Sequence, residues 1–113
     1  MKTIIAGSRT ITDFSLVEQA IIESGFEITK VISGMAKGVD SLGELWAHYN
    51  NIGIRYCPAN WIKHKKAAIY IRNVEMAEIA DALIVIIENY SRGSTHMLEI
   101  AQNKGLQVYC KRV

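Results

Sequence analysis

The stretch Ala82-Leu83-Ile84-Val85-Ile86-Ile87 is apolar at every position. A strand that faces water on one side alternates apolar and polar residues, whereas a strand buried on both faces of a parallel sheet has no solvent-facing side. This run therefore predicts the centre of a parallel sheet.

Four further apolar runs surround it along the chain, at residues 3–6, 28–32, 54–57 and 106–110. Longer amphipathic segments separate the runs, and the first of these has a helix cap at Asp13 and an end near Gly25. The helical stripes expected in the other segments are Val39, Leu42, Trp46 and Tyr49; Ala68, Ile71, Met76, Ile79 and Ala80; and Met97, Ile100 and Ala101. Strands alternating with helices, joined by right-handed crossovers, predict an α/β fold: a three-layer Rossmann-like sandwich with a five-stranded parallel sheet.

Composition limits the possible classes of protein. The chain has 113 residues, half of them hydrophobic, which predicts a single domain over residues 1–113. A net charge of +2 argues against wrapping duplex nucleic acid. Cys57 and Cys110 lack CxxC spacing and the three histidines lack ligand spacing, so neither a disulfide, a metal site nor a cofactor is expected. The chain has no apolar run long enough for a signal peptide or a membrane span, which predicts a cytoplasmic protein.

Three glycine-bearing loops each follow an expected strand and precede an expected helix. Glycine lets backbone N–H groups approach a ligand, and a helix start attracts anions. Because ligands of open α/β sheets bind beyond the carboxyl ends of the strands, a nucleotide-like ligand is predicted there. The residues expected to bind it are Gly7, Ser8 and Arg9; Gly34, Met35, Lys37, Gly38 and Asp40; Asn60, Trp61, Lys66, Arg72 and Asn73; and Tyr90, Ser91, Arg92, Gly93, Ser94 and Thr95.

Several of these residues have alternative explanations. Arg9 and Arg72 suit bidentate phosphate contact or are solvated charges. Asp40 binds a ribose hydroxyl or is an acid favoured in the first turn of a helix. Trp61 and Tyr90 stack on a base or pack against the protein.

The order of motifs GSR, SGMAKGVD, PANW, KAAIYIRN and SRGST resembles the SLOG superfamily, in particular its small YAcAr-type members related to YspA and YpsA. The resemblance implies strand order 3-2-1-4-5 and a pocket for nucleotide-derived ligands. Relatives in the superfamily include phosphoribohydrolases of the lonely-guy type, a DNA-processing protein, and sensor domains for ADP-ribose-type signals in antiviral defence. They tend to be dimers or tetramers.

The sequence departs from that family at positions that bear on chemistry. Met35 replaces a usual glycine, and Lys65, Ile69 and Tyr70 replace a glycine, a glycine and a proline. Met97 stands where lonely-guy enzymes have a catalytic glutamate, and a thioether cannot transfer a proton. No catalytic residue is therefore assigned.

The favoured function is binding of a nucleotide-derived small molecule, ADP-ribose-like or a cyclic nucleotide, by a sensor or sequestering protein. One alternative is a hydrolase of an N-glycosidic or phosphate bond, with Asp40 or Glu88 as the carboxylate. A second is single-stranded nucleic-acid binding through Trp61 and the basic run 63–66, although no extended basic groove is evident. A homo-oligomer is expected because Trp46, Tyr49, Ile69, Tyr70 and Met76 exceed what one small sandwich buries.

Overall fold

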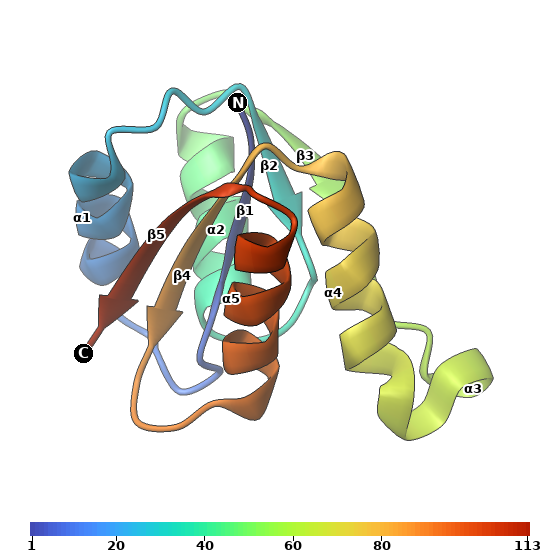
Figure 1. Ribbon diagram of the computed structural model, residues 1–113. Coiled ribbons are helices and arrows are strands. Elements are labelled where there is room, and N and C mark those ends of the chain that lie inside the picture. Colours follow the sequence, from blue (N-terminus) through green and yellow to red (C-terminus); the bar gives the residue numbers. More distant parts are fainter.

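A five-stranded parallel sheet in the order β3-β2-β1-β4-β5 forms the centre of the computed structural model, which describes residues 1–113 (Figure 1). The strands are β1 (Lys2–Gly7), β2 (Lys30–Ser33), β3 (Gly53–Tyr56), β4 (Ala82–Ile87) and β5 (Gln107–Arg112). The predicted α/β fold, the parallel sheet and the strand order are confirmed. β1 is the middle strand, and β4 lies between β1 and β5 with all its residues buried.

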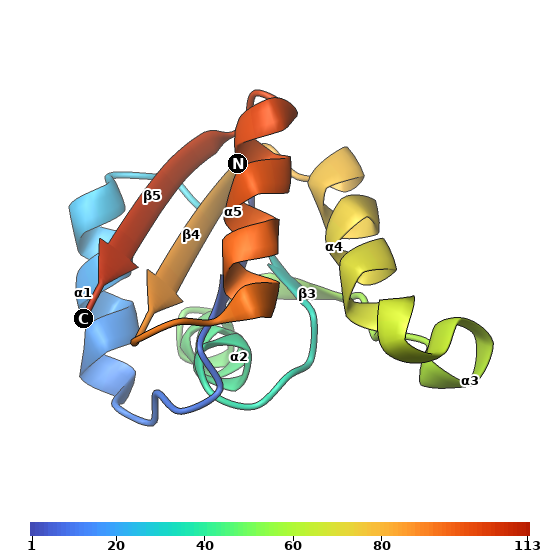
Figure 2. The same ribbon diagram turned by 60° about the horizontal axis from the view of Figure 1, so that its bottom comes forward.

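Helices cover both faces of this sheet and make it the middle of three layers (Figures 1 and 2). α1 (Phe14–Ser24) and α2 (Val39–Tyr49) pack on the face that presents Ile5, Val31 and Ile84. α4 (Ala68–Ile79) and α5 (Arg92–Asn103) pack on the other, against Ile4, Ile32 and Val85. Each face thus has its own apolar cluster, and neighbouring residues of one strand belong to different clusters.

The ends of α1 follow local signals in the sequence. The Asp13 carboxylate accepts a hydrogen bond from the Ser15 N–H at 2.9 Å, and Gly25 ends the helix in the left-handed conformation at φ +68°. A carboxylate cap and a left-handed glycine each satisfy backbone groups that a helix end leaves free. The boundaries predicted for this helix are confirmed.

The chain between β3 and α4 contains a short helix, α3 (Trp61–His64), and a 3-10 turn, η1 (Lys65–Ala67), which no stripe in the sequence predicted. Asn60 caps α3, since its side-chain oxygen accepts the Lys63 N–H at 3.0 Å. α3 projects from the body of the protein beyond the lower end of α4 (Figure 1). It buries none of its residues, so it contributes surface rather than core.

The face expected for α2 needs correction, whereas the place of Met76 in the stripe expected for α4 is confirmed. In α2 the buried face is Val39, Gly43 and Ala47, while Tyr49 is 66% exposed. Gly43 allows this close packing, because a Cβ there would lie 2.7 Å from Ile5 Cγ2. In α4, Met76 is buried and does not add to an exposed apolar surface.

Burial of Met76 leaves fewer outward-facing residues to support the expected homo-oligomer, which stays a prediction for light scattering to test. No helix combines the length and the apolar character that crossing a membrane requires.

Candidate ligand-binding cleft

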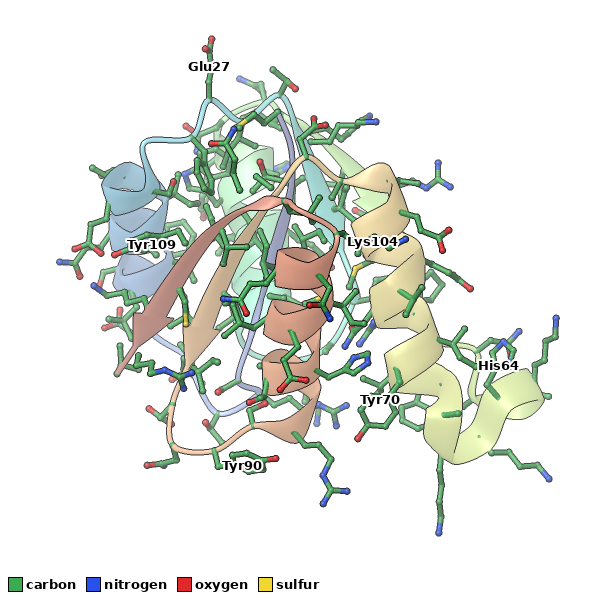
Figure 3. All side chains as sticks on the ribbon, in the orientation of Figure 1. Glu27, His64, Tyr70, Tyr90, Lys104 and Tyr109 are labelled. Atoms are coloured by element: carbon green, nitrogen blue, oxygen red, sulfur yellow. The ribbon has the colours of Figure 1, made fainter.

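A cleft of about 460 Å³ opens at the carboxyl ends of the central strands. Its walls come from the loop after β1, the loop after β4 and the starts of α4 and α5. Tyr70 on α4 and Tyr90 in the loop before α5 both lie at this lower edge of the molecule (Figure 3). The volume lies within the range of small-molecule sites, and the position is the one that open parallel sheets offer to ligands.

The start of α5 forms one wall. Ser91 caps the helix through its hydroxyl, which accepts the Ser94 N–H at 3.4 Å and donates to the Ser94 hydroxyl at 2.9 Å. The N–H groups of Arg92 and Gly93, the first two of the helix, have no acceptor within the chain. Free N–H groups at the positive end of a helix are suited to binding an anion.

Arg72 of α4 lines the same cleft as this helix start and is only 7% exposed. Its Nη1 donates to the Gly34 carbonyl and its Nε donates to Asn73 Oδ1 at 3.3 Å, which leaves Nη2 without a protein acceptor. Burial lowers the pKa of this guanidinium from its ordinary value, and the nearby Asp40 carboxylate opposes that shift. A buried, permanently charged arginine with a free nitrogen at a cleft suits phosphate recognition.

Gly34 is required for this arginine to reach its place. A Cβ on Gly34 would lie 2.5 Å from Arg72 Nη1 and 2.9 Å from Asp40 Oδ2. Any larger residue there would separate the guanidinium from the carbonyl that fixes it. The glycine predicted to bind phosphate therefore has a steric role toward Arg72.

Asp40, in the first turn of α2, is 4% exposed and lines the cleft. Burial raises its pKa from 3.8 to about 6, against the lowering effects of hydrogen bonds from the Ala36 and Gly7 backbone and of the Arg72 charge. The Ala36 N–H lies 3.3 Å from Oδ2. Asp40 thus connects the loop after β2 to the loop after β1, close to the positive charge of Arg72.

The loops after β1 and β4 are fastened to each other across the cleft floor. The Ser8 hydroxyl accepts the Glu88 N–H at 2.9 Å and donates to the Glu88 carbonyl at 3.4 Å. The Thr10 hydroxyl donates to Glu88 Oε1 at 2.7 Å, which fixes the only carboxylate besides Asp40 that lines the cleft. These bonds hold Ser8 and Glu88 in position without a ligand.

The start of α2 differs from that of α5, although both follow glycine-bearing loops. The Ser8 carbonyl accepts the Val39 N–H at 3.4 Å, so the loop after β1 occupies the space in front of α2. Gly38 adopts φ +76°, and a Cβ on it would lie 2.3 Å from that carbonyl oxygen. Gly38 therefore serves the packing of two loops, and it does not line the cleft.

A smaller cavity of about 280 Å³ adjoins the cleft on the side of α3. It shares four residues with the cleft and is otherwise lined by Gly34, Met35, Pro58, Ala59 and Trp61. The shared residues are Arg9, Ala36, Ile69 and Arg72. Two arginines therefore stand where the cavities meet.

The structure brings together most of the residues predicted from the sequence. Those lining the larger cleft are Gly7, Ser8, Arg9, Asp40, Arg72, Asn73, Tyr90, Ser91, Arg92, Gly93 and Ser94. Those lining only the smaller cavity are Gly34, Met35 and Trp61, and those lining neither are Lys37, Gly38, Asn60, Lys66 and Thr95. Contact of any of them with a ligand stays a prediction.

Sequence analysis missed Thr10 and Asn89, which also line the cleft. Both belong to loops at the carboxyl edge of the sheet, so the position of those loops was the available signal. The sequence analysis also did not predict the contact of Asn73 Nδ2 with His96 Nδ1 at 3.1 Å. Because an amide nitrogen only donates, His96 Nδ1 is the acceptor. The structure has no cluster of three or more His, Cys, Asp or Glu side chains that could hold a metal ion.

The fold and the position of this cleft define a Rossmann-like protein. The model of the YspA, cpYpsA-related SLOG family, YAcAr, matches residues 1–64, and the chain belongs to this family. A search of curated proteins gave no match.

A solved structure shares the fold: DNA processing protein A (DprA) from Streptococcus pneumoniae, with a TM-score of 0.78 and 21% sequence identity. The superposition covers 96% of this chain and 49% of the DprA chain, so this chain spans about half of that protein.

Proposed function

We propose that this protein binds a phosphate-bearing, nucleotide-derived small molecule in the cleft, as a sensor or sequestering protein for an ADP-ribose-like compound or a cyclic nucleotide. The observation that carries the proposal is Arg72, buried with a nitrogen free at the same cleft as the unpaired N–H groups of Arg92 and Gly93. An arginine and a helix start are each suited to binding a phosphate group. Membership of a SLOG family supports the nucleotide part of the proposal.

Calorimetric titration with inorganic pyrophosphate, ADP-ribose and cyclic AMP tests the proposal. Arg9 is exposed and lines the cleft, so Arg9→Ala removes a charge without opening the core. We expect it to weaken binding about 10-fold or more, as losing a charge-assisted hydrogen bond does. Arg55→Ala, an exposed arginine on β3 that lines neither cavity, is the matched control and should bind as the wild type does.

Identification of the natural ligand needs a separate experiment. Mass spectrometry of small molecules released from the purified protein should reveal a compound containing phosphate. If the protein binds none of the three probes and releases no phosphate compound, the proposal is wrong.

Hydrolysis is the second candidate, and the position of Glu88 favours it. Its carboxylate lines the cleft and is held by Thr10. Asp40 has its carboxylate engaged by backbone N–H groups, and buried Met97 lines the cleft where related phosphoribohydrolases have a glutamate. Release of free base or phosphate that disappears in Glu88→Gln would establish this activity, and binding without turnover would exclude it.

A further inference from the structure

The smaller cavity meets the cleft at Arg9 and Arg72, so a ligand held by these arginines can extend into either space. The two sides differ in chemistry. Beyond the arginines, the cleft presents the start of α5 together with Tyr70 and Tyr90, whereas the smaller cavity presents a methionine, a proline and a tryptophan. A space with a helix start and a space with an apolar wall, meeting at a cationic centre, match a molecule with charged and aromatic parts.

The apolar wall consists of side chains that the fold itself does not bury. Met35 is 51% exposed and Trp61 is 53% exposed, and both line the smaller cavity. Trp61 lies on α3, which contributes nothing to the core. A large aromatic side chain with an open face beside a cavity is suited to stacking on a flat ring.

Met35 also adopts a backbone conformation that its side chain disfavours. Its φ is +63°, in the left-handed region, where non-glycine residues are strained. Two of the other non-glycine residues in this region are Asn51 and Asn89, and asparagine tolerates it. Glycine would remove the strain at position 35, but it would also remove the side chain that forms this wall.

We propose that the smaller cavity binds the base of a nucleoside diphosphate whose phosphates lie between Arg9 and Arg72 and reach toward the start of α5. The base stacks on Trp61, and Met35 covers it from the loop after β2. This inference rests on the proposed function and adds to it the ligand class and the orientation of the ligand: base on the α3 side, phosphates on the α5 side.

The experiment compares inorganic pyrophosphate with ADP, GDP, CDP and UDP by calorimetric titration of wild-type protein, Trp61→Ala, Met35→Gly and Ile62→Ala. Ile62 is the matched control, since it neighbours Trp61 on α3, is 94% exposed and lines neither cavity. We expect the best nucleoside diphosphate to bind wild-type protein and Ile62→Ala about 10-fold tighter than pyrophosphate, as one stacked base provides. In Trp61→Ala and Met35→Gly this preference should fall to about 2-fold or less, with pyrophosphate affinity unchanged.

Met35→Gly protects the test against a folding artefact, because it relieves a strained backbone and should not lower the melting temperature. In a Trp46→Phe background, Trp61 is the remaining tryptophan, and its fluorescence should be quenched by the nucleoside diphosphate but not by pyrophosphate.

The outcomes separate this inference from the proposed function. Pyrophosphate binding without any preference for a nucleoside diphosphate, or a preference that survives Trp61→Ala and Met35→Gly, overturns the base subsite and leaves the phosphate site intact. Failure of all five compounds to bind overturns the base subsite, and the titrations with ADP-ribose and cyclic AMP then decide the proposed function.

Discussion

The N-terminal ends of α2 and α5 have similar preceding sequences but lie in different environments. Each helix follows a strand and a glycine-bearing loop at the same edge of the sheet. At α2, the Ser8 carbonyl accepts the first N–H group, and Gly38 presses against that carbonyl. At α5, Ser91 caps the helix, and Arg92 and Gly93, which line the cleft, have unpaired N–H groups.

The comparison separates two uses of a glycine-bearing loop before a helix: packing against another loop at the first N–H group of α2, and leaving the first N–H groups without an acceptor at α5. Glycine at such a loop allows close approach of whatever lies in front of it, and at α2 the neighbour is another loop of the same chain. At α5 a Cβ on Gly93 would meet only Ile69 Cγ2, at 3.5 Å, so the fold does not need glycine there. Gly93, where the fold has room for a side chain, is therefore a better candidate for ligand contact than Gly38.

The largest effect that tests this comparison is expected from Gly38→Ala, with Gly93→Ala as its matched partner. Alanine at position 38 meets the Ser8 carbonyl in a backbone conformation reserved for glycine, so the free energy of unfolding should fall by about 3 kcal/mol or more. Alanine at position 93 should change it by less than about 0.5 kcal/mol. Urea denaturation of both variants measures the difference.

Pyrophosphate binding by Gly93→Ala completes that test. A methyl group beside the unpaired N–H groups should weaken binding about 10-fold while the fold is unaffected. Equal losses of stability in the two variants, or unchanged pyrophosphate binding in Gly93→Ala, would mean that the two helix starts do not divide their roles in this way.

A second prediction concerns Asp40, the acid in the first turn of α2. Its pKa is raised from 3.8 to about 6, so the folded state binds its proton more tightly than the unfolded state does. The resulting stabilisation is complete below pH 3.8 and is lost as the pH rises through about 6. A shift of about two pKa units corresponds to about 3 kcal/mol.

Asp40→Asn removes this titration and tests it. Between pH 4 and pH 7 the wild-type protein should lose about 3 kcal/mol of stability relative to the variant, as followed by urea denaturation across that range. Asparagine cannot fully replace a carboxylate that accepts two backbone N–H groups. The slope of the free energy of unfolding against pH is therefore more informative than the variant's stability at one pH. Parallel pH profiles would show that Asp40 is not buried at the α2 start as the structure describes.

Much of the fold could be predicted because its signals are local. The unbroken apolar run of β4 identifies an interior parallel strand, and Asp13 and Gly25 mark the ends of α1 within a few residues of sequence. Tyr49 was wrongly expected in the buried stripe of α2, because helical periodicity identifies the buried face of a helix but not the residues at its edge. The true stripe includes Gly43, which has no side chain and therefore adds little to an apolar pattern.

The site was predicted less completely because its main contacts join distant segments. Arg72 reaches Gly34 across 38 residues, and Ser8 meets Glu88 across 80. The rule that ligands bind at the carboxyl edge of the sheet identified the loops that form the site, yet it could not show that Gly38 packs on Ser8 or that Lys66 lines neither cavity. Asn60 was recognisable locally as a helix cap and was assigned to the ligand instead.

The smallest effect expected concerns the caps of two helices, Ser91 on α5 and Asp13 on α1. Each side chain accepts a backbone N–H, so Ser91→Ala and Asp13→Ala should each lower the free energy of unfolding by about 1 kcal/mol. The two variants are thus matched in stability, and only Ser91 lines the cleft. Thermal or urea denaturation establishes that match before any binding measurement.

Pyrophosphate titration then separates the two caps. Ser91 fixes the first turn of α5, so without it the N–H groups of Arg92 and Gly93 are held less firmly toward the cleft, and binding should weaken about 3-fold to 10-fold. Asp13→Ala should bind as the wild-type protein does, because α1 starts outside the cleft. If both variants bind equally well, anions reach the cleft through Arg9 and Arg72 alone, and the open start of α5 is a feature of the fold rather than of the site.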